Sequence, residues 1–84
     1  MKTFQELGEA LAARRKLRNL TQAEVARSAG LSRELVARFE KGQLTELGSR
    51  KLLAVLAVLG LEMTFIEVGR AGSLEELRRE RGGA

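Results

Sequence analysis

The sequence predicts an all-α domain of four to five helices, followed by a short C-terminal β-strand that pairs across a dimer. The chain has 84 residues and no Pro, and it is rich in Leu, Ala, Glu and Arg, a composition that favours helix. Residues 3–6 and 21–24 both have the Thr-x-x-Glu spacing of a helix-capping box. After Gly60 the apolar residues change from helical to alternating spacing, which is typical of a strand.

The first predicted helix follows the first capping box. Phe4, Leu7 and Leu11 recur at helical spacing and give it one apolar face. The basic run 14–18 forms its last turn, where positive charge suits the negative end of the helix dipole. Asn19 comes next, and this residue type tolerates the left-handed backbone that ends many helices.

Two shorter helices follow in the sequence. The second helix opens with the second capping box and runs to Ala29, and Gly30 ends it. Ser32 caps a third helix over Arg33–Lys41. The apolar positions of this third helix are Leu35, Val36 and Phe39.

A fourth helix is predicted from about Ser49 to Leu59. Its apolar residues face nearly all sides, which indicates the central and most buried helix. The segment Leu61–Val68 then has β-branched and aromatic residues and reads as a strand. Residues 73–77 have one more capping-box spacing, which predicts one or two further helical turns.

The composition argues against most classes of enzyme. The chain contains no Cys, His, Tyr or Trp, and all eleven acidic residues are Glu. Without Cys the chain cannot form disulfides. Without Cys, His and Asp it lacks the usual ligands of a zinc or iron site. Without His, Ser–His and Cys–His catalysis have no general base. We expect no metal, no cofactor and no enzymatic activity.

The charge balance points to an anionic partner. Fifteen Lys and Arg residues against eleven Glu give a net charge of +4, and the pI is about 10.3. This balance suits a nucleic acid, although many small proteins are mildly basic. The N-terminus has no secretory pattern, and the apolar run Leu52–Leu61 is too short to span a bilayer. We expect a cytoplasmic protein with no membrane association.

The run from Thr21 to Gly42 carries most of the functional information. Two short helices joined by a tight turn with a Gly form a helix-turn-helix. Ala26 and Ala29, in the first helix of this motif, are small enough for its second helix, residues 33–41, to cross closely. Gly30 supplies the backbone angle of the turn. On the second helix of the motif, the polar side chains that we expect to face outward are Arg33, Glu34 and Arg38.

Three segments of this run resemble the signature of the Cro/Xre-type helix-turn-helix regulators of bacteria and phage. They are Leu20–Ala26, Gly30–Ser32 and Phe39–Gly42, and the later Leu52–Leu61 is similar to the final helix of that family. The resemblance covers about residues 4–61. In that family the second helix of the motif enters the DNA major groove. The resemblance therefore implies a sequence-specific regulator of transcription, a repressor, whose partner is double-stranded DNA.

The second helix of the motif, residues 33–41, is called the recognition helix below. The resemblance places base contacts in its first turn and one turn later. An Arg offers two parallel donors to O6 and N7 of guanine. Glu34 either accepts a hydrogen bond from cytosine or orients Arg38, four residues on. A solvated helix face is the alternative for the two Arg residues. The residues expected to contact bases are Ser32, Arg33, Glu34 and Arg38.

Phosphate contacts are expected from five further residues. Gln22 stands at the first position of its helix, where free N–H groups bind a phosphate oxygen. Arg50 and Lys51 stand in the first turn of the fourth helix, where positive charge opposes the helix dipole, so a phosphate role explains them better than a structural one. Lys41 and Gln43 lie at and just after the end of the recognition helix and reach the same DNA backbone.

Arg15 and Glu40 match two positions that form an internal ion pair in the family, so we expect them to join the first helix to the third. The chain departs from the family pattern at two places. Asn19 stands where Gly is usual, and the loop 43–48 is long, lacks Pro and carries Glu46. These departures put DNA-backbone contacts from the loop in doubt.

The predicted strand needs a partner, because its N–H and C=O groups are otherwise unpaired. The same strand of a second copy, antiparallel across a two-fold axis, is the simplest partner. Leu61, Met63 and Phe65 would cover the two helical cores, and Ile66 and Val68 would seal the contact between subunits. A homodimer also sets two recognition helices about 34 Å apart, in successive major grooves of a palindromic operator.

The chain therefore divides into a helix-turn-helix DNA-binding domain at residues 1–60, a dimerisation strand at 61–69 and a short tail at 70–84. This layout also resembles the antitoxin subunits of HipBA-type modules. The second interpretation is thus an antitoxin of a type II toxin–antitoxin module, which neutralises a cognate toxin by protein contact and represses its own operon. The third is a protein-interaction module that has lost DNA binding. Two outward Arg side chains favour DNA over this third interpretation.

Overall fold

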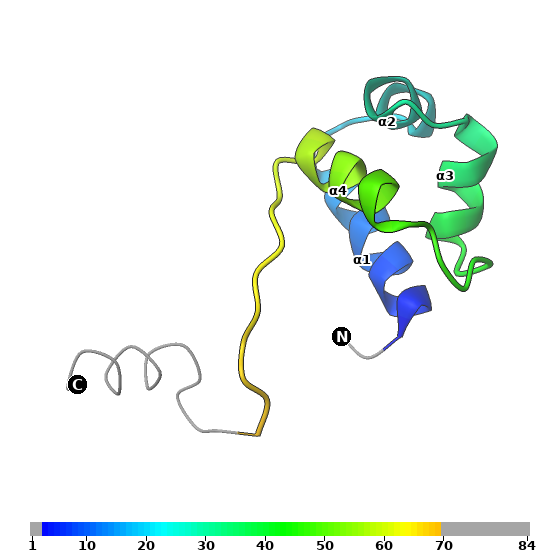
Figure 1. Ribbon diagram of the computed structural model, residues 1–84. Coiled ribbons are helices and arrows are strands. Elements are labelled where there is room, and N and C mark those ends of the chain that lie inside the picture. The colour runs from blue at the N-terminus through cyan, green and yellow to red at the C-terminus, as the bar shows by residue number, and fades with distance from the viewer. Residues whose placement is uncertain (1–2, 70–84) are drawn as a thin grey trace.

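The computed structural model describes residues 3–69, which form four helices around one core (Figure 1). The helices are α1 (Phe4–Leu17), α2 (Gln22–Ala29), α3 (Arg33–Glu40) and α4 (Ser49–Val58). The prediction of four helices is confirmed, and no strand is present between residues 3 and 69. The predicted turns at 73–77, and the whole tail 70–84, lie outside the described residues.

Side-chain caps fix where three of the helices begin. The Thr3 hydroxyl accepts the N–H of Glu6 at 3.0 Å at the start of α1. At α2 the capping box is complete, because Thr21 accepts the N–H of Glu24 at 3.0 Å and the Glu24 carboxylate accepts the N–H of Thr21 at 2.8 Å. The Ser32 hydroxyl caps α3 in the same way. These local signals are the ones that the sequence predicts.

The core lies between the four helices and the loop that precedes α4. Its buried members are Leu11, Val25, Phe39, Leu47, Val55, Leu56 and Leu59. Leu47 belongs to the loop 43–48, in which the sequence shows no pattern. The loop therefore contributes an apolar side chain to the core and does not merely connect α3 to α4.

The prediction that α4 is the central, most buried helix was wrong. Leu53, in the middle of α4, is 51% exposed. The helix α2 packs against both α3 and α4, and α3 packs also against α1. One side of α4 thus remains uncovered by the described residues, because an apolar sequence on all sides does not by itself supply neighbours on all sides.

A close helix crossing sets the position of α3. Gly8 in α1 is buried against α3, and a Cβ atom there would overlap the backbone carbonyl of Phe39. The rings of Phe4 and Phe39 lie beside this crossing, with centroids 5.2 Å apart and tilted by 47°. The helix α3 is therefore held against α1 by its own backbone as well as by side chains.

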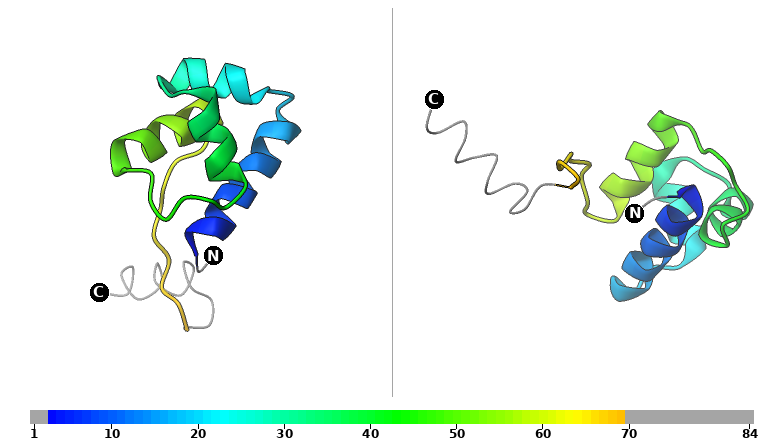
Figure 2. Two further views of the ribbon diagram at one scale, coloured as in Figure 1. Left: turned by 90° about the vertical axis from the view of Figure 1, so that its right-hand side faces the viewer. Right: turned by 90° about the horizontal axis from the view of Figure 1, so that it is seen from below.

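The chain leaves the domain after α4. Gly60 has a φ of 72°, and the N–H of Leu61 donates to the carbonyl of Leu56 at 2.8 Å. From there residues 61–69 extend away from the helices (Figures 1 and 2). Residues 62–69 are all exposed. Pairing of this segment in a dimer stays a prediction.

Candidate nucleic-acid interface

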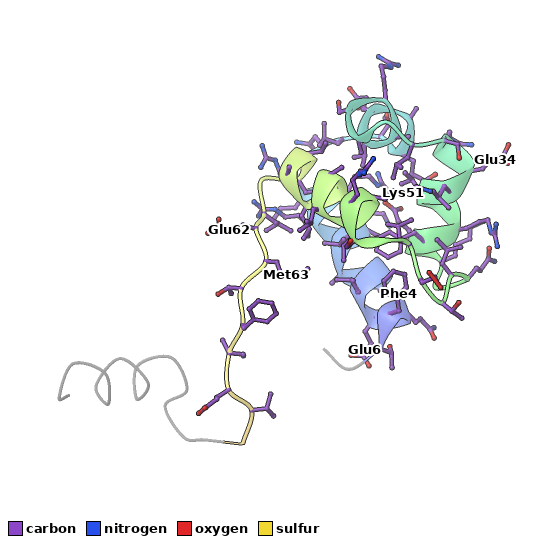
Figure 3. All side chains as sticks on the ribbon, viewed as in Figure 1. Phe4, Glu6, Glu34, Lys51, Glu62 and Met63 are labelled. Carbon is purple, nitrogen blue, oxygen red and sulfur yellow. The ribbon has the colours of Figure 1, made fainter. Side chains whose placement is uncertain are left out.

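The outer face of α3 is polar and free of packing. Arg33, Glu34 and Arg38 are exposed, whereas Val36 and Phe39, on the opposite face, are buried. Glu34 points away from the domain on the free side of α3 (Figure 3). This arrangement leaves two guanidinium groups and one carboxylate available to a partner along one helix.

Ser32 has a structural task at the start of α3. Its hydroxyl oxygen accepts the N–H of Leu35 at 3.1 Å, which leaves the hydroxyl proton as the group that can be donated to a ligand. The side chain is exposed, directly beside Arg33.

An internal network joins α1, α2 and α3 at the C-terminal end of α3. Arg15 Nε donates to Glu40 Oε2 at 2.7 Å, and Arg15 Nη2 donates to Oε1 at 2.9 Å. Gln22 Nε2 donates to the same Oε1 at 2.9 Å, and Arg15 Nη1 donates to the carbonyl of Leu20 at 2.7 Å. The expected pair of Arg15 and Glu40 therefore lies in contact, with Gln22 as a third member that the sequence did not reveal.

The network holds Glu40 in its charged form. Burial works to raise the pKa of Glu40, but the hydrogen bonds from Arg15 and Gln22 outweigh it, and the pKa is lowered. The hydrogen bond to Glu40 raises the pKa of Arg15. Both side chains are largely removed from water, with 11% of Arg15 and 9% of Glu40 exposed. The pair is therefore a fixed joint between α1 and α3.

Gln22 is held at the N-terminus of α2 by this network. One N–H of its amide goes to Glu40, so its second N–H and the free backbone N–H groups of the helix end remain for a ligand. Lys41 is exposed and follows Glu40 directly. The hydrogen bond between Gln22 and Glu40 thus brings the start of α2 to the end of α3, where Lys41 lies.

The remaining expected phosphate ligands lie on and before the first turn of α4. Arg50 and Lys51 are exposed in that turn, which holds no acidic residue and has Gly48 as a cap without a side chain. Figure 3 shows Lys51 on α4. The turn therefore combines positive charge with uncapped N–H groups, as an anion site does. Gln43 is exposed in the loop, and its N–H donates to the carbonyl of Arg38 at 3.0 Å.

Sequence reasoning missed the role of two arginines at the end of α1. Arg14 Nε and Arg18 Nη1 each donate to the carbonyl of Leu59, both at 3.1 Å. The sequence assigned this basic turn to the dipole of its own helix. Its partner is 41 and 45 residues away along the chain, so no local pattern could have identified it.

The expected dimer residues form an exposed apolar series. Leu61 is half-buried against the core, and Met63, Phe65, Ile66 and Val68 are exposed. Glu62 and Met63 project from the segment as it leaves α4 (Figure 3). Four large apolar side chains within six residues are thus left without cover in the single chain.

The described part of the chain contains no pocket and no group of three potential metal ligands. None of its helices is both long and apolar enough to cross a bilayer.

Comparison with known proteins agrees with this geometry. No curated protein matches the chain. The crystal structure of the clp gene regulator ClgR from Corynebacterium glutamicum is similar, with 29% identity and a TM-score of 0.66. The similarity covers 69% of this chain and 61% of that one. A family described as helix-turn-helix matches residues 11–66, which is 56 of the 84 residues. The chain belongs to the Cro/C1-type helix-turn-helix family.

Proposed function

We propose that the chain is a sequence-specific DNA-binding regulator of transcription, a repressor that acts as a homodimer on a palindromic operator. The observation that carries the proposal is the outer face of α3. Arg33 and Arg38 are exposed on a helix that the helix-turn-helix motif presents outward, while Val36 and Phe39 anchor its other face. Similarity to a clp gene regulator supports the same class of function.

In this proposal the residues on the outer face of α3 contact the bases. Arg33 and Arg38 each suit a guanine through two parallel donors, and Glu34 suits a cytosine amino group. Ser32 donates its hydroxyl proton to a base edge or a nearby phosphate while its oxygen caps α3. These contacts choose the sequence.

Phosphate contacts fix the register of the protein on the duplex. Gln22 and Lys41 bind one phosphate region, because the network around Glu40 brings them to the same place. Arg50 and Lys51 bind another at the start of α4, with Gln43 beside the recognition helix. These ligands confer affinity that falls as salt rises, with little preference for sequence.

A homodimer is needed to bind both half-sites of the operator. The apolar series Met63, Phe65, Ile66 and Val68 is exposed in the single chain and suits antiparallel pairing with its equivalent. The pairing gives each operator half one recognition helix. A toxin protein that covers the same series is the rival occupant, and the antitoxin interpretation predicts a complex with such a protein in place of the free homodimer.

The test is selection of binding sites by the full chain from a pool of random duplex DNA. We expect a two-fold symmetric sequence with half-sites about one helical turn apart. Arg38→Ala should then weaken binding to that sequence by about 1–3 kcal/mol and relax the preference at one base pair per half-site.

Arg27→Ala is the matched control, because Arg27 is an exposed arginine in the last turn of α2, outside the proposed contacts. It removes the same charge and should leave the base preference unchanged. Enrichment of no sequence, or equal binding of Arg38→Ala and wild type, would reject DNA readout and favour the protein-interaction module.

A further inference from the structure

Two guanidinium groups from α1 converge on one backbone carbonyl at the end of α4. Arg14 Nε and Arg18 Nη1 both donate to the oxygen of Leu59 at 3.1 Å. The Leu59 side chain is 1% exposed and belongs to the core, so its carbonyl is fixed from both sides. This pair of hydrogen bonds, together with Leu59, is called the exit clamp below.

Capping of α4 does not account for both arginines. The backbone already closes this helix, because the N–H of Leu61 bonds the carbonyl of Leu56 and Gly60 takes a left-handed φ of 72°. Arg14 lies in the last turn of α1 and Arg18 is the C-cap of that helix, four residues on, a spacing at which like charges repel. A single cation would satisfy the Leu59 carbonyl and the helix dipole without that repulsion.

The exit clamp lies where the chain leaves the helical domain. Leu59 is two residues before Leu61, the last residue of this region that packs against the core. Residues 62–69 are all exposed. The backbone direction at 59–61 therefore decides where the apolar segment points from the domain.

The fit around Gly60 is correspondingly tight. A Cβ atom at Gly60 would collide with Arg18 Nη1 and would lie 3.6 Å from Arg14 Nη2. The guanidinium groups thus cover the turn itself as well as the carbonyl before it. The turn cannot change its course without displacing them.

We propose that Arg14 and Arg18 are positioning residues that set the angle between the two helix-turn-helix units of the dimer. The proposal rests on the homodimer of the proposed function and goes beyond it. By fixing the exit of residues 61–69, the exit clamp fixes where each α3 lies relative to the two-fold axis. Its loss leaves each domain intact but lets the recognition helices vary in separation.

The first test measures geometry without DNA. The chain has no Cys, so Ser28→Cys, at an exposed position of α2, gives one spin label per copy. Pulsed electron paramagnetic resonance then measures the distribution of distances between the two labels in the dimer. We expect a narrow distribution, which Arg14→Met with Arg18→Met should broaden about twofold or more because a fixed exit becomes a flexible linker.

A second variant reaches the exit clamp without removing charge. Gly60→Ala should displace Arg18 and broaden the distribution in the same way. Gly30→Ala is its matched control, because Gly30 has the same φ of 72° and a Cβ there meets nothing within 4 Å. The two positions share the left-handed φ, so the contrast between the variants reports the collision with Arg18, and only Gly60→Ala should change the distance.

DNA binding supplies a readout that helix capping alone would not move. The double Met variant should bind a single half-site within about twofold of wild type, and should lose about tenfold on the two-half-site operator, because the two contacts are no longer held in register. It should also tolerate altered spacing between half-sites.

The outcomes separate this inference from the proposed function. The exit clamp is overturned as a positioning device if the distance distribution is unchanged in both variants. It is overturned as well if the labelled wild-type chain shows no dipolar coupling between two labels. Broadened distances in a chain that binds no DNA would uphold it and reject the regulator. Equal losses on the half-site and on the full operator would show a role in stability only.

Discussion

The carboxylate of Glu40 receives the guanidinium of Arg15 through two hydrogen bonds, of 2.7 and 2.9 Å, and the amide of Gln22 through a third. Three helices meet at this one side chain. The end of the recognition helix, the start of α2 and the middle of the basic turn of α1 are therefore held together by a single carboxylate.

Removal of that carboxylate should destabilise the fold strongly. Glu40→Ala leaves the mostly buried charge of Arg15 without its partner, so we expect the free energy of unfolding to fall by about 3 kcal/mol. Urea denaturation followed by circular dichroism measures this loss. Glu46→Ala, in the exposed part of the loop 43–48, should change stability by less than about 0.5 kcal/mol. Similar losses in the two variants would contradict the role of the ion pair.

Acid should remove the contribution of the same pair. The pKa of Glu40 is lower in the folded chain than in the unfolded one, so the unfolded state binds its proton first as pH falls. The stability that Glu40 confers is therefore complete above its unfolded pKa, and disappears as pH falls through its folded pKa. The difference in unfolding free energy between wild type and Glu40→Gln should be largest near neutral pH and shrink in acid. A difference that stays constant with pH would be inconsistent with the lowered pKa.

The crossing of α1 and α3 should not tolerate a methyl group. Gly8→Ala gains roughly 1 kcal/mol in helix propensity, yet its Cβ overlaps the backbone carbonyl of Phe39. Because backbone cannot move aside as a flexible side chain can, we expect a net loss of about 1–2 kcal/mol from overpacking, measured by thermal or urea unfolding. Ala10→Gly, at an exposed site of the same helix, reports the propensity change alone. A Gly8→Ala variant more stable than wild type would refute the close crossing.

The apolar segment should control the oligomeric state. Phe65 is 85% exposed in the single chain, so Phe65→Asp should leave the helix content unchanged. In the proposed dimer the new carboxylate would be buried against apolar side chains without a partner, and sedimentation should find monomers where the wild type is dimeric. Thr45→Asp adds the same charge in an exposed loop and should remain dimeric. Persistence of the dimer in Phe65→Asp would place the subunit contact elsewhere.

The helices could be predicted from the sequence because their signals are local. The caps at Thr3, Thr21 and Ser32 lie next to the helices that they start, and Gly30 and Gly60 end helices by a backbone angle that few other residues adopt. The internal pair of Arg15 and Glu40 came instead from family resemblance. Its 25-residue separation leaves no periodic trace.

The remaining features depend on where distant parts of the chain meet. Leu47 is a single apolar residue in a loop, so no repeat marks it as part of the core. Leu53 looks as apolar as its neighbours in α4, yet it faces outward. The hydrogen bonds from Arg14 and Arg18 to Leu59 exist only once α1 and α4 lie in place. Sequence periodicity predicts which elements form but not which of their faces meet.

Residues 62–69 are exposed in the single chain, so the homodimer that we propose would form to an extent that depends on the concentration of the protein. When chains are scarce, most remain single, and the amount of paired protein rises with the square of the total. Operator occupancy would then respond steeply to small changes in synthesis or turnover. The exposed apolar segment of the proposed dimer would thereby make DNA binding sensitive to the number of copies of the protein.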